Sequence, residues 1–262
     1  MSGAVERPRF SDIAGAQERL RGRVIRTPLR RSAWLSEALG VPVWLKLECV
    51  QQTGSFKIRG ALNAAILHAE RHSRLPAPLV TASAGNHGLA LAMAAQQMET
   101  RLTVFVPHDA PATKTRAIER HGAQLVLERD YDAAEQAAKA FARREGASYV
   151  SPYTHADVIA GAGTVALEIF EDLPDAHTVI VPVGGGGLAS GVGLALRARA
   201  AGIRTIGVEA EASTAFTASL REGRVTRVAP KPTATRRQWR SRAAPYRRLR
   251  RPWSNVSGVR RA

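Results

Sequence analysis

Three glycine-containing segments of the sequence combine turn-forming residues with groups that can do chemistry. The first, TGSFKIRGA at residues 53–61, places Lys57 in the first turn of an expected helix, just after a Gly-Ser turn. The positive end of a helix dipole disfavours a cation there, which would help to lower the pKa of this lysine. A lysine with a lowered pKa can form an imine with a carbonyl compound. Most lysines are solvated surface residues, so this segment alone does not assign a function.

The second segment, TASAGNHGLA at residues 81–90, lies where an expected strand ends and an expected helix begins. Gly85 and Gly88 permit a sharp turn, and the free amides of such a helix start can bind an anion such as a carboxylate. Asn86 and His87 add side-chain donors at the same place. A helix cap and a histidine satisfied by neighbouring groups would explain these residues without any ligand.

The third segment, VPVGGGGLASG at residues 181–191, reads as a strand, a loop of four glycines and a helix start. Such a loop can surround a phosphate with backbone N–H groups, and four consecutive glycines are entropically costly without such a use. A weaker alternative is a dinucleotide-binding fingerprint formed by Gly184, Gly186 and Ala189. Glu209 would then be the ribose-binding acid. That alternative leaves the other two segments unexplained.

The elements expected around these segments alternate between short apolar strands and amphipathic helices, from Val41 to Glu222. Such alternation predicts an α/β protein with parallel sheets covered on both faces. The expected strands are Val43–Leu47, Leu79–Ala82, Leu102–Val106, Gln124–Leu127, Tyr149–Ser151, Thr178–Val183 and Thr205–Val208. The expected helices are Ser55–His72, Asn86–Gln97, Thr113–His121, Tyr131–Glu145, Asp157–Phe170, Leu188–Ala200 and Thr214–Arg221.

Taken together, in this order and spacing, TGSFKIRGA, SAGNHG and PVGGGGL resemble the fold-type II pyridoxal-phosphate enzymes, in particular the serine/threonine dehydratase and serine racemase branch. The resemblance covers about residues 10–232. Sister branches usually have aspartate after the reactive lysine, whereas Ile58 and Arg59 follow Lys57 here. The resemblance implies a tryptophan synthase beta-like fold, with two parallel-sheet domains and the cofactor between them.

The same resemblance implies which residues hold pyridoxal 5'-phosphate. Lys57 would carry the cofactor as an imine and then act as the base on the substrate Cα–H. Phe56 would pack beside the cofactor, and Asn86 would hydrogen-bond its 3'-hydroxyl. The phosphate would lie on Gly184, Gly185, Gly186 and Gly187.

The resemblance also implies a substrate site and a reaction. Ser83, Asn86 and His87 would line the substrate carboxylate, with Ser83 counted as catalytic. The reaction would be dehydration and deamination of L-threonine or L-serine to a 2-oxo acid and ammonia. Ala84 stands where the racemase branch has a proton-donating serine, which favours dehydration over racemisation.

The sequence departs from the family pattern at two further places, a metal site found in some relatives and the segment at residues 161–164. No firm metal site is expected, because Ala215 stands six residues after Glu209, where some relatives have an aspartate. The segment that usually reads GQGT is GAGT at residues 161–164, so Ala162 replaces an amide side chain.

The resemblance divides the chain into a large domain in two parts, at residues 1–77 and 153–232, and a small domain at residues 78–152. The formal charge of +16 is concentrated after these domains, because residues 233–262 hold ten arginines and no lysine, aspartate or glutamate, which leaves 16 − 10 = +6 for the rest. This tail has neither helical nor strand periodicity. We expect it to be out-of-frame or foreign sequence, which would leave the fold incomplete and the chain with little or no activity.

Several alternatives and general expectations accompany this interpretation. The chain could be an inactive remnant or a cofactor-binding pseudoenzyme, and the basic tail could bind nucleic acid. A single cysteine, Cys49, excludes an intrachain disulfide, and the first ten residues contain no apolar signal segment. The uncharged stretch at residues 178–196 contains Pro182 and four glycines, which disfavours a membrane helix. We therefore expect a cytoplasmic protein without a membrane partner. The resemblance implies an amino-acid substrate and, for the fully folded protein, a homodimer.

Overall fold

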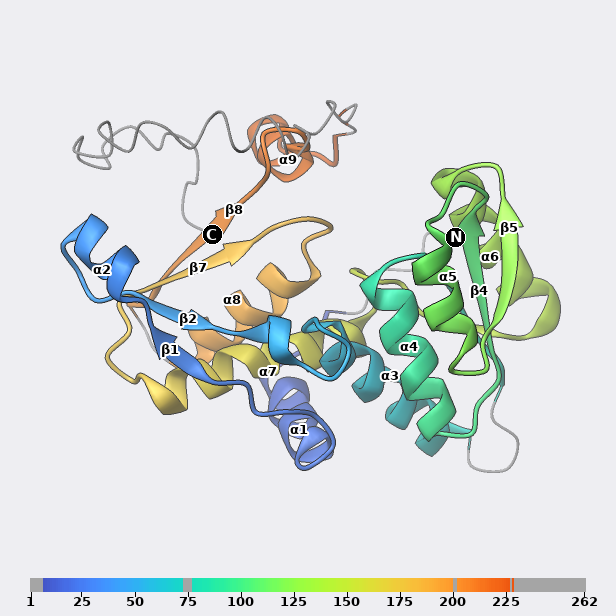
Figure 1. The fold of residues 1–262 in the computed structure, drawn as a ribbon, viewed down its shortest axis with the longest axis horizontal. Coiled ribbons are helices and arrows are strands. Elements are labelled where there is room, and N and C mark those ends of the chain that lie inside the picture. The colour runs from blue at the N-terminus through green and yellow to red at the C-terminus, as the bar shows by residue number, and fades with distance from the viewer. Residues whose placement is uncertain (1–6, 73–76, 200–201, 227, 229–262) are drawn as a thin grey trace.

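The computed structural model describes residues 7–72, 77–199, 202–226 and 228, and these form two lobes that meet around α3 and α7 (Figure 1). The basic tail at residues 233–262 lies outside the described residues. The strands are β1 (Leu29–Arg31), β2 (Trp44–Lys46), β3 (Leu79–Ala82), β4 (Leu102–Pro107), β5 (Gln124–Glu128), β6 (Ser148–Tyr149), β7 (Thr178–Pro182) and β8 (Arg204–Val208). The helices are α1 (Phe10–Leu20), α2 (Ala33–Leu39), the 3-10 turn η1 (Glu48–Val50), α3 (Lys57–Arg71), α4 (Asn86–Gln97), α5 (Ala112–Glu119), α6 (Tyr131–Glu145), α7 (Ala156–Asp172), α8 (Gly187–Arg199) and α9 (Ala215–Glu222).

The lobe on the right of Figure 1 is built on a parallel four-stranded sheet in the order β5-β4-β3-β6. Its central strand β3 is apolar and wholly buried. Leu79 packs with residues of α3 and α4 on one face, whereas Val80 packs with α6 on the other. Neighbouring side chains of a strand point to opposite faces, so a strand covered on both sides must be apolar throughout. The predicted parallel sheet with two covered faces is confirmed.

The other lobe contains two separate two-stranded sheets. Strands β7 and β8 pair in parallel, as expected, but alternate residues of β7 are exposed, so the described residues do not cover both faces of this sheet as predicted. Strands β1 and β2 pair antiparallel. The antiparallel pair was not predicted, because β1 is only Leu-Arg-Arg and has no apolar alternation. Helix α1 was also missed, although Ile13, Ala16 and Leu20 form a buried stripe with helical spacing. The strands and helices predicted between residues 43 and 221 all have counterparts whose ends differ by a few residues.

Helices α3, α7 and α8 stack side by side, and glycines line their contacts. A methyl group on Gly60 of α3 would lie 2.5 Å from the Val158 carbonyl oxygen of α7. One on Gly191 of α8 would lie 2.7 Å from the Gly163 nitrogen of α7. Distances this short leave no room for any side chain, so the helix backbones are in direct contact. No helix within the described ranges is long and apolar enough to cross a membrane.

Candidate active site

Lys57 is the first residue of α3, and Phe56 is its N-cap. The Nζ atom donates a hydrogen bond of 2.7 Å to the carbonyl oxygen of Pro152 and lies 5.1 Å from the centre of the Phe56 ring. Burial lowers the pKa of the Lys57 amine from 10.5 to about 8, because the charged form loses hydration. The lowered pKa agrees with the prediction, but its cause is burial, whereas the prediction invoked the helix dipole.

The second motif is the turn between β3 and α4, which begins at Asn86. The Asn86 side chain is exposed, and the Ser83 hydroxyl accepts a 3.3 Å hydrogen bond from the backbone N–H of Gly85. A methyl group on Gly88 would collide with the Ser83 carbonyl, so only glycine permits this tight turn. The amides at the start of α4 therefore face the same turn as Ser83 and Asn86.

His87 points into the protein, and only 2% of it is exposed. Its Nε2 donates a 3.3 Å hydrogen bond to the carbonyl oxygen of Val150, and its Nδ1 has no hydrogen-bond partner. Burial, reinforced by the nearby charge of Lys57, lowers the pKa of His87 to about 3. The imidazole is therefore neutral, with a proton on Nε2 and an unused acceptor at Nδ1.

The third motif is the glycine loop, residues 184–187, between β7 and α8. Gly184 and Gly185 are exposed, Gly186 has a φ of +86°, and Gly187 is the first residue of α8. A methyl group on Gly184 would meet nothing within 4 Å. The loop therefore presents backbone groups beside open space at the start of a helix, the arrangement that suits a phosphate.

The three motifs converge on the segment that links β6 to α7, residues 150–153. Thr81 and His87 both hydrogen-bond to the Val150 carbonyl, and Lys57 bonds to the Pro152 carbonyl. The ring of Tyr153 packs against the glycine loop. None of this linking segment was predicted to belong to the site. Its only sequence signal is a Pro-Tyr pair between a strand end and a helix start.

Glu209 does not serve as a free acid in this structure. Its carboxylate accepts hydrogen bonds of 2.7 and 2.8 Å from the backbone N–H groups of Thr217 and Phe216 and one of 2.6 Å from the Thr217 hydroxyl. It therefore caps the first turn of α9. The described residues contain no group of three histidine, cysteine, aspartate or glutamate side chains that could hold a metal ion.

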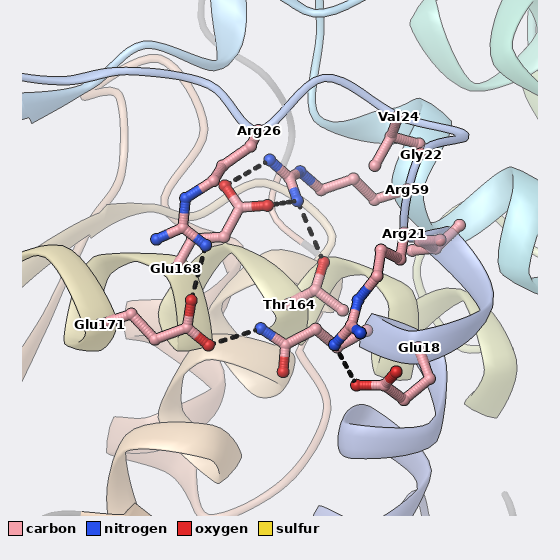
Figure 2. Close-up of a pocket in the computed structure, with 11 residues that line it drawn as sticks. Glu18, Arg21, Gly22, Val24, Arg26, Arg59, Thr164, Glu168 and Glu171 are labelled. Carbon is pink, nitrogen blue, oxygen red and sulfur yellow. Dashed lines mark hydrogen bonds and ion pairs between the residues drawn. The ribbon is translucent and has the colours of Figure 1, made fainter.

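Arg59, in the first turn of α3, is the centre of a buried network of ion pairs, part of which is drawn in Figure 2. Its guanidinium is 1% exposed and bonds to both oxygens of Glu48, at 2.8 and 2.9 Å, and both oxygens of Glu168, at 2.6 and 2.9 Å. Lys46 adds a second cation, 2.6 Å from Glu168. These pairs connect the segment before α3 to α7, and they fix the position from which the lysine projects.

A pocket of about 350 Å³ lies beside this network, between α1, α3 and α7 (Figure 2). Glu18, Glu168 and Glu171 line it, each bonded to an arginine. None of the predicted site residues lines the pocket. It is therefore separate from the candidate site at Lys57.

Comparisons with known proteins agree with the geometry. A family model described as "Pyridoxal-phosphate dependent enzyme" matches residues 20–246. The L-threonine ammonia-lyase of Thermotoga maritima is 46% identical over 225 residues, which are 86% of this chain and 56% of that protein. The L-threonine ammonia-lyase of Geobacter sulfurreducens is 41% identical over 220 residues, which are 84% of this chain and 54% of that protein. The structure of maize serine racemase has a TM-score of 0.81 at 31% identity, and the match covers 87% of this chain and 69% of that one. The chain thus spans a little over half the length of the two ammonia-lyases.

Proposed function

Because the chain belongs to the family of pyridoxal-phosphate dependent enzymes, we propose that it holds this cofactor on Lys57 and eliminates the β-hydroxyl of L-threonine or L-serine. The products are a 2-oxo acid and ammonia. The fold class expected from the resemblance is confirmed by the similarity to serine racemase. The observation that carries the proposal is the half-buried Lys57 amine, whose pKa of about 8 leaves a useful neutral fraction near neutral pH.

The residues around Lys57 fit the cofactor. The open space at Gly184 and the amides of the glycine loop suit the phosphate. The Phe56 ring, close to the Lys57 amine, provides an apolar surface for the cofactor ring. Asn86 is exposed and free to bond the 3'-hydroxyl. When bound, pyridoxal phosphate supplies an electron sink for the charge that remains after loss of the Cα proton.

The chain's own residues bind the substrate and move its proton. Once the substrate's own amine had displaced Lys57 from the cofactor, the neutral Lys57 amine would accept the Cα proton, and the Pro152 carbonyl would orient that amine by its hydrogen bond. Ser83, Asn86 and the first amides of α4 bind the carboxylate. We place His87 behind these carboxylate-binding groups and not in contact with the substrate, because it is buried and uses its only donor on the Val150 carbonyl. Ala84 offers no proton donor, so elimination is favoured over racemisation.

The proposal includes three statements about the whole protein. They are a homodimeric assembly, a cytoplasmic location, and a small domain at residues 78–152 between the two parts of a large one. The last is supported by the four-stranded sheet, whose strands all lie between Leu79 and Tyr149.

The test uses the purified 262-residue chain with pyridoxal phosphate, followed by its visible absorbance and by release of 2-oxo acid and ammonia. Borohydride should trap the cofactor on a peptide that contains Lys57, and Lys57→Ala should abolish both trapping and turnover. Lys114→Ala, at an exposed lysine of α5, is the matched control and should change neither. Trapping at another lysine would disprove the assignment of Lys57. Trapping at Lys57 without turnover of either amino acid would reduce the proposal to cofactor binding, the outcome expected if residues 233–262 are foreign sequence that leaves the fold incomplete.

A further inference from the structure

Tyr153 packs so closely against the glycine loop that it determines which residues the loop can contain. A methyl group on Gly185 would lie 2.5 Å from Cγ and 2.6 Å from Cδ1 of the Tyr153 ring. One on Gly187 would lie 3.1 Å from the Tyr153 Cα. The loop backbone therefore lies directly on the tyrosine, with no side chain between them.

The backbone of Gly185 does not itself require glycine. In the glycine loop only Gly186 has a positive φ. Alanine could therefore adopt the backbone conformation at position 185, and the ring of Tyr153 is what excludes it. Position 184 differs, because a methyl group there meets no protein atom within 4 Å.

The other end of Tyr153 reaches the opposite lobe. Its hydroxyl donates a hydrogen bond of 3.5 Å to Glu135 of α6, and Tyr131, the first residue of α6, also hydrogen-bonds to it. Burial, and then the charge of Glu135, raise the pKa of Tyr153, so the hydroxyl stays protonated as a donor. The tyrosine therefore spans from α6 to the loop between β7 and α8.

We infer that Tyr153 is a positioning residue, which holds the glycine loop in its anion-binding conformation and connects it to α6 of the opposite lobe. Its ring supports the backbone at Gly185 and Gly187. Its hydroxyl fixes the ring from the other side through Glu135. The consequence for cofactor affinity rests on the proposed function, whereas the contact between ring and loop does not.

The test is a double-mutant cycle of Gly185→Ala and Tyr153→Ala in the full chain, read by the affinities for pyridoxal phosphate and for pyridoxal. Gly185→Ala alone should weaken binding of pyridoxal phosphate by roughly ten- to a hundredfold, because the methyl group displaces the ring and the loop. The same change in the Tyr153→Ala background should cost several-fold less, because the two ring atoms are gone and only Cβ, 2.8 Å from the methyl group, remains. Pyridoxal, which lacks the phosphate, should be affected little in every variant. Tyr153→Phe keeps the ring and should retain most of the affinity.

Unfolding of the cofactor-free protein provides a second reading of the same cycle. Gly185→Ala should lower the melting temperature clearly more in the wild-type background than in the Tyr153→Ala background, where only the Cβ contact of 2.8 Å remains. Gly193→Ala, at an open position of α8, is the control and should show no such dependence on Tyr153. Additive effects in both readings, or equal losses for pyridoxal and pyridoxal phosphate, would overturn the inference. If the wild-type chain bound no pyridoxal phosphate, the proposed function would fail, and the unfolding cycle alone would decide the inference.

Discussion

Replacing Lys57 with methionine should stabilise the cofactor-free protein near neutral pH, although the lysine is the central residue of the site. Burial lowers the pKa of this amine from 10.5 to about 8. Protonated Lys57 therefore costs the folded state about 3 kcal/mol, since one pKa unit corresponds to about 1.4 kcal/mol. Methionine removes this cost but also removes the hydrogen bond to Pro152, which is worth about 1 kcal/mol. The expected net gain in the free energy of unfolding is about 2 kcal/mol near pH 7.

The gain should disappear as the pH rises. The folded-state pKa of Lys57 is lower than its unfolded value, so the cost is fully present below about pH 8 and is lost between about 8 and 10.5. Near pH 10 the variant and the wild type should therefore be about equally stable. Urea unfolding followed by circular dichroism at several pH values across this window measures the difference directly.

Lys114→Met is the matched control, because it makes the same chemical change at an exposed lysine of α5. Its effect on the free energy of unfolding should be small and independent of pH. If Lys57→Met raised the free energy of unfolding by the same amount at every pH, burial would not be penalising the protonated amine. A loss of stability near pH 7 would refute the reasoning altogether.

Three further predictions concern stability. Glu168→Ala leaves a buried guanidinium and a buried ammonium without their shared carboxylate, so it should lower the free energy of unfolding in urea by about 3–5 kcal/mol. Glu171→Ala removes an exposed ion pair on the same helix and should lower it by under about 1 kcal/mol. Equal losses would contradict the role given to burial. Gly191→Ala forces a methyl group against the α7 backbone and should lower the stability measured in thermal melts by about 1–3 kcal/mol. Gly193→Ala places its methyl group in open space and should raise that stability by about 0.5–1 kcal/mol. A rise in stability for both variants would show that the helices can move apart. The pKa of His87 falls from 6.5 to about 3 on folding, so as the pH falls His87 is protonated in the unfolded chain before it is protonated in the folded one. The free energy of unfolding should therefore decrease as the pH falls from about 6.5 to about 3. His87→Gln should reduce this loss, and an unchanged acid-unfolding midpoint would rule out His87 as its source.

The parts of the site that depend on local chain geometry could be predicted from the sequence. The starts of α3, α4 and α8 follow glycine-containing turns, so Lys57 was expected in the first turn of its helix and Asn86 at a helix start, as observed. Helix α8 begins at Gly187, one residue before the expected Leu188. The contacts that connect those starts could not be predicted in the same way. The Lys57 amine meets a carbonyl 95 residues further along the chain, and no local pattern encodes such a pairing. For the same reason the sequence indicated a lowered pKa through the helix dipole but not the burial that causes it.

The unpredicted elements have a different explanation. Strand β1 contains two arginines in three residues, and its pairing with β2 depends on the partner strand rather than on its own composition. Helix α1, in contrast, has a readable stripe of apolar residues at Ile13, Ala16 and Leu20, and this spacing is a signal that predicts the helix.

The glycine contacts among α3, α7 and α8 determine how the two reactive parts of the site are held relative to each other. Lys57 begins α3 and Gly187 begins α8, and α7 lies against both helices. Because main chain touches main chain at Gly60 and Gly191, the spacing between the Lys57 backbone and the glycine loop does not depend on core side-chain rotamers that could rearrange. Core side chains elsewhere in the lobes can therefore diverge widely during evolution while the separation of these two groups remains constant.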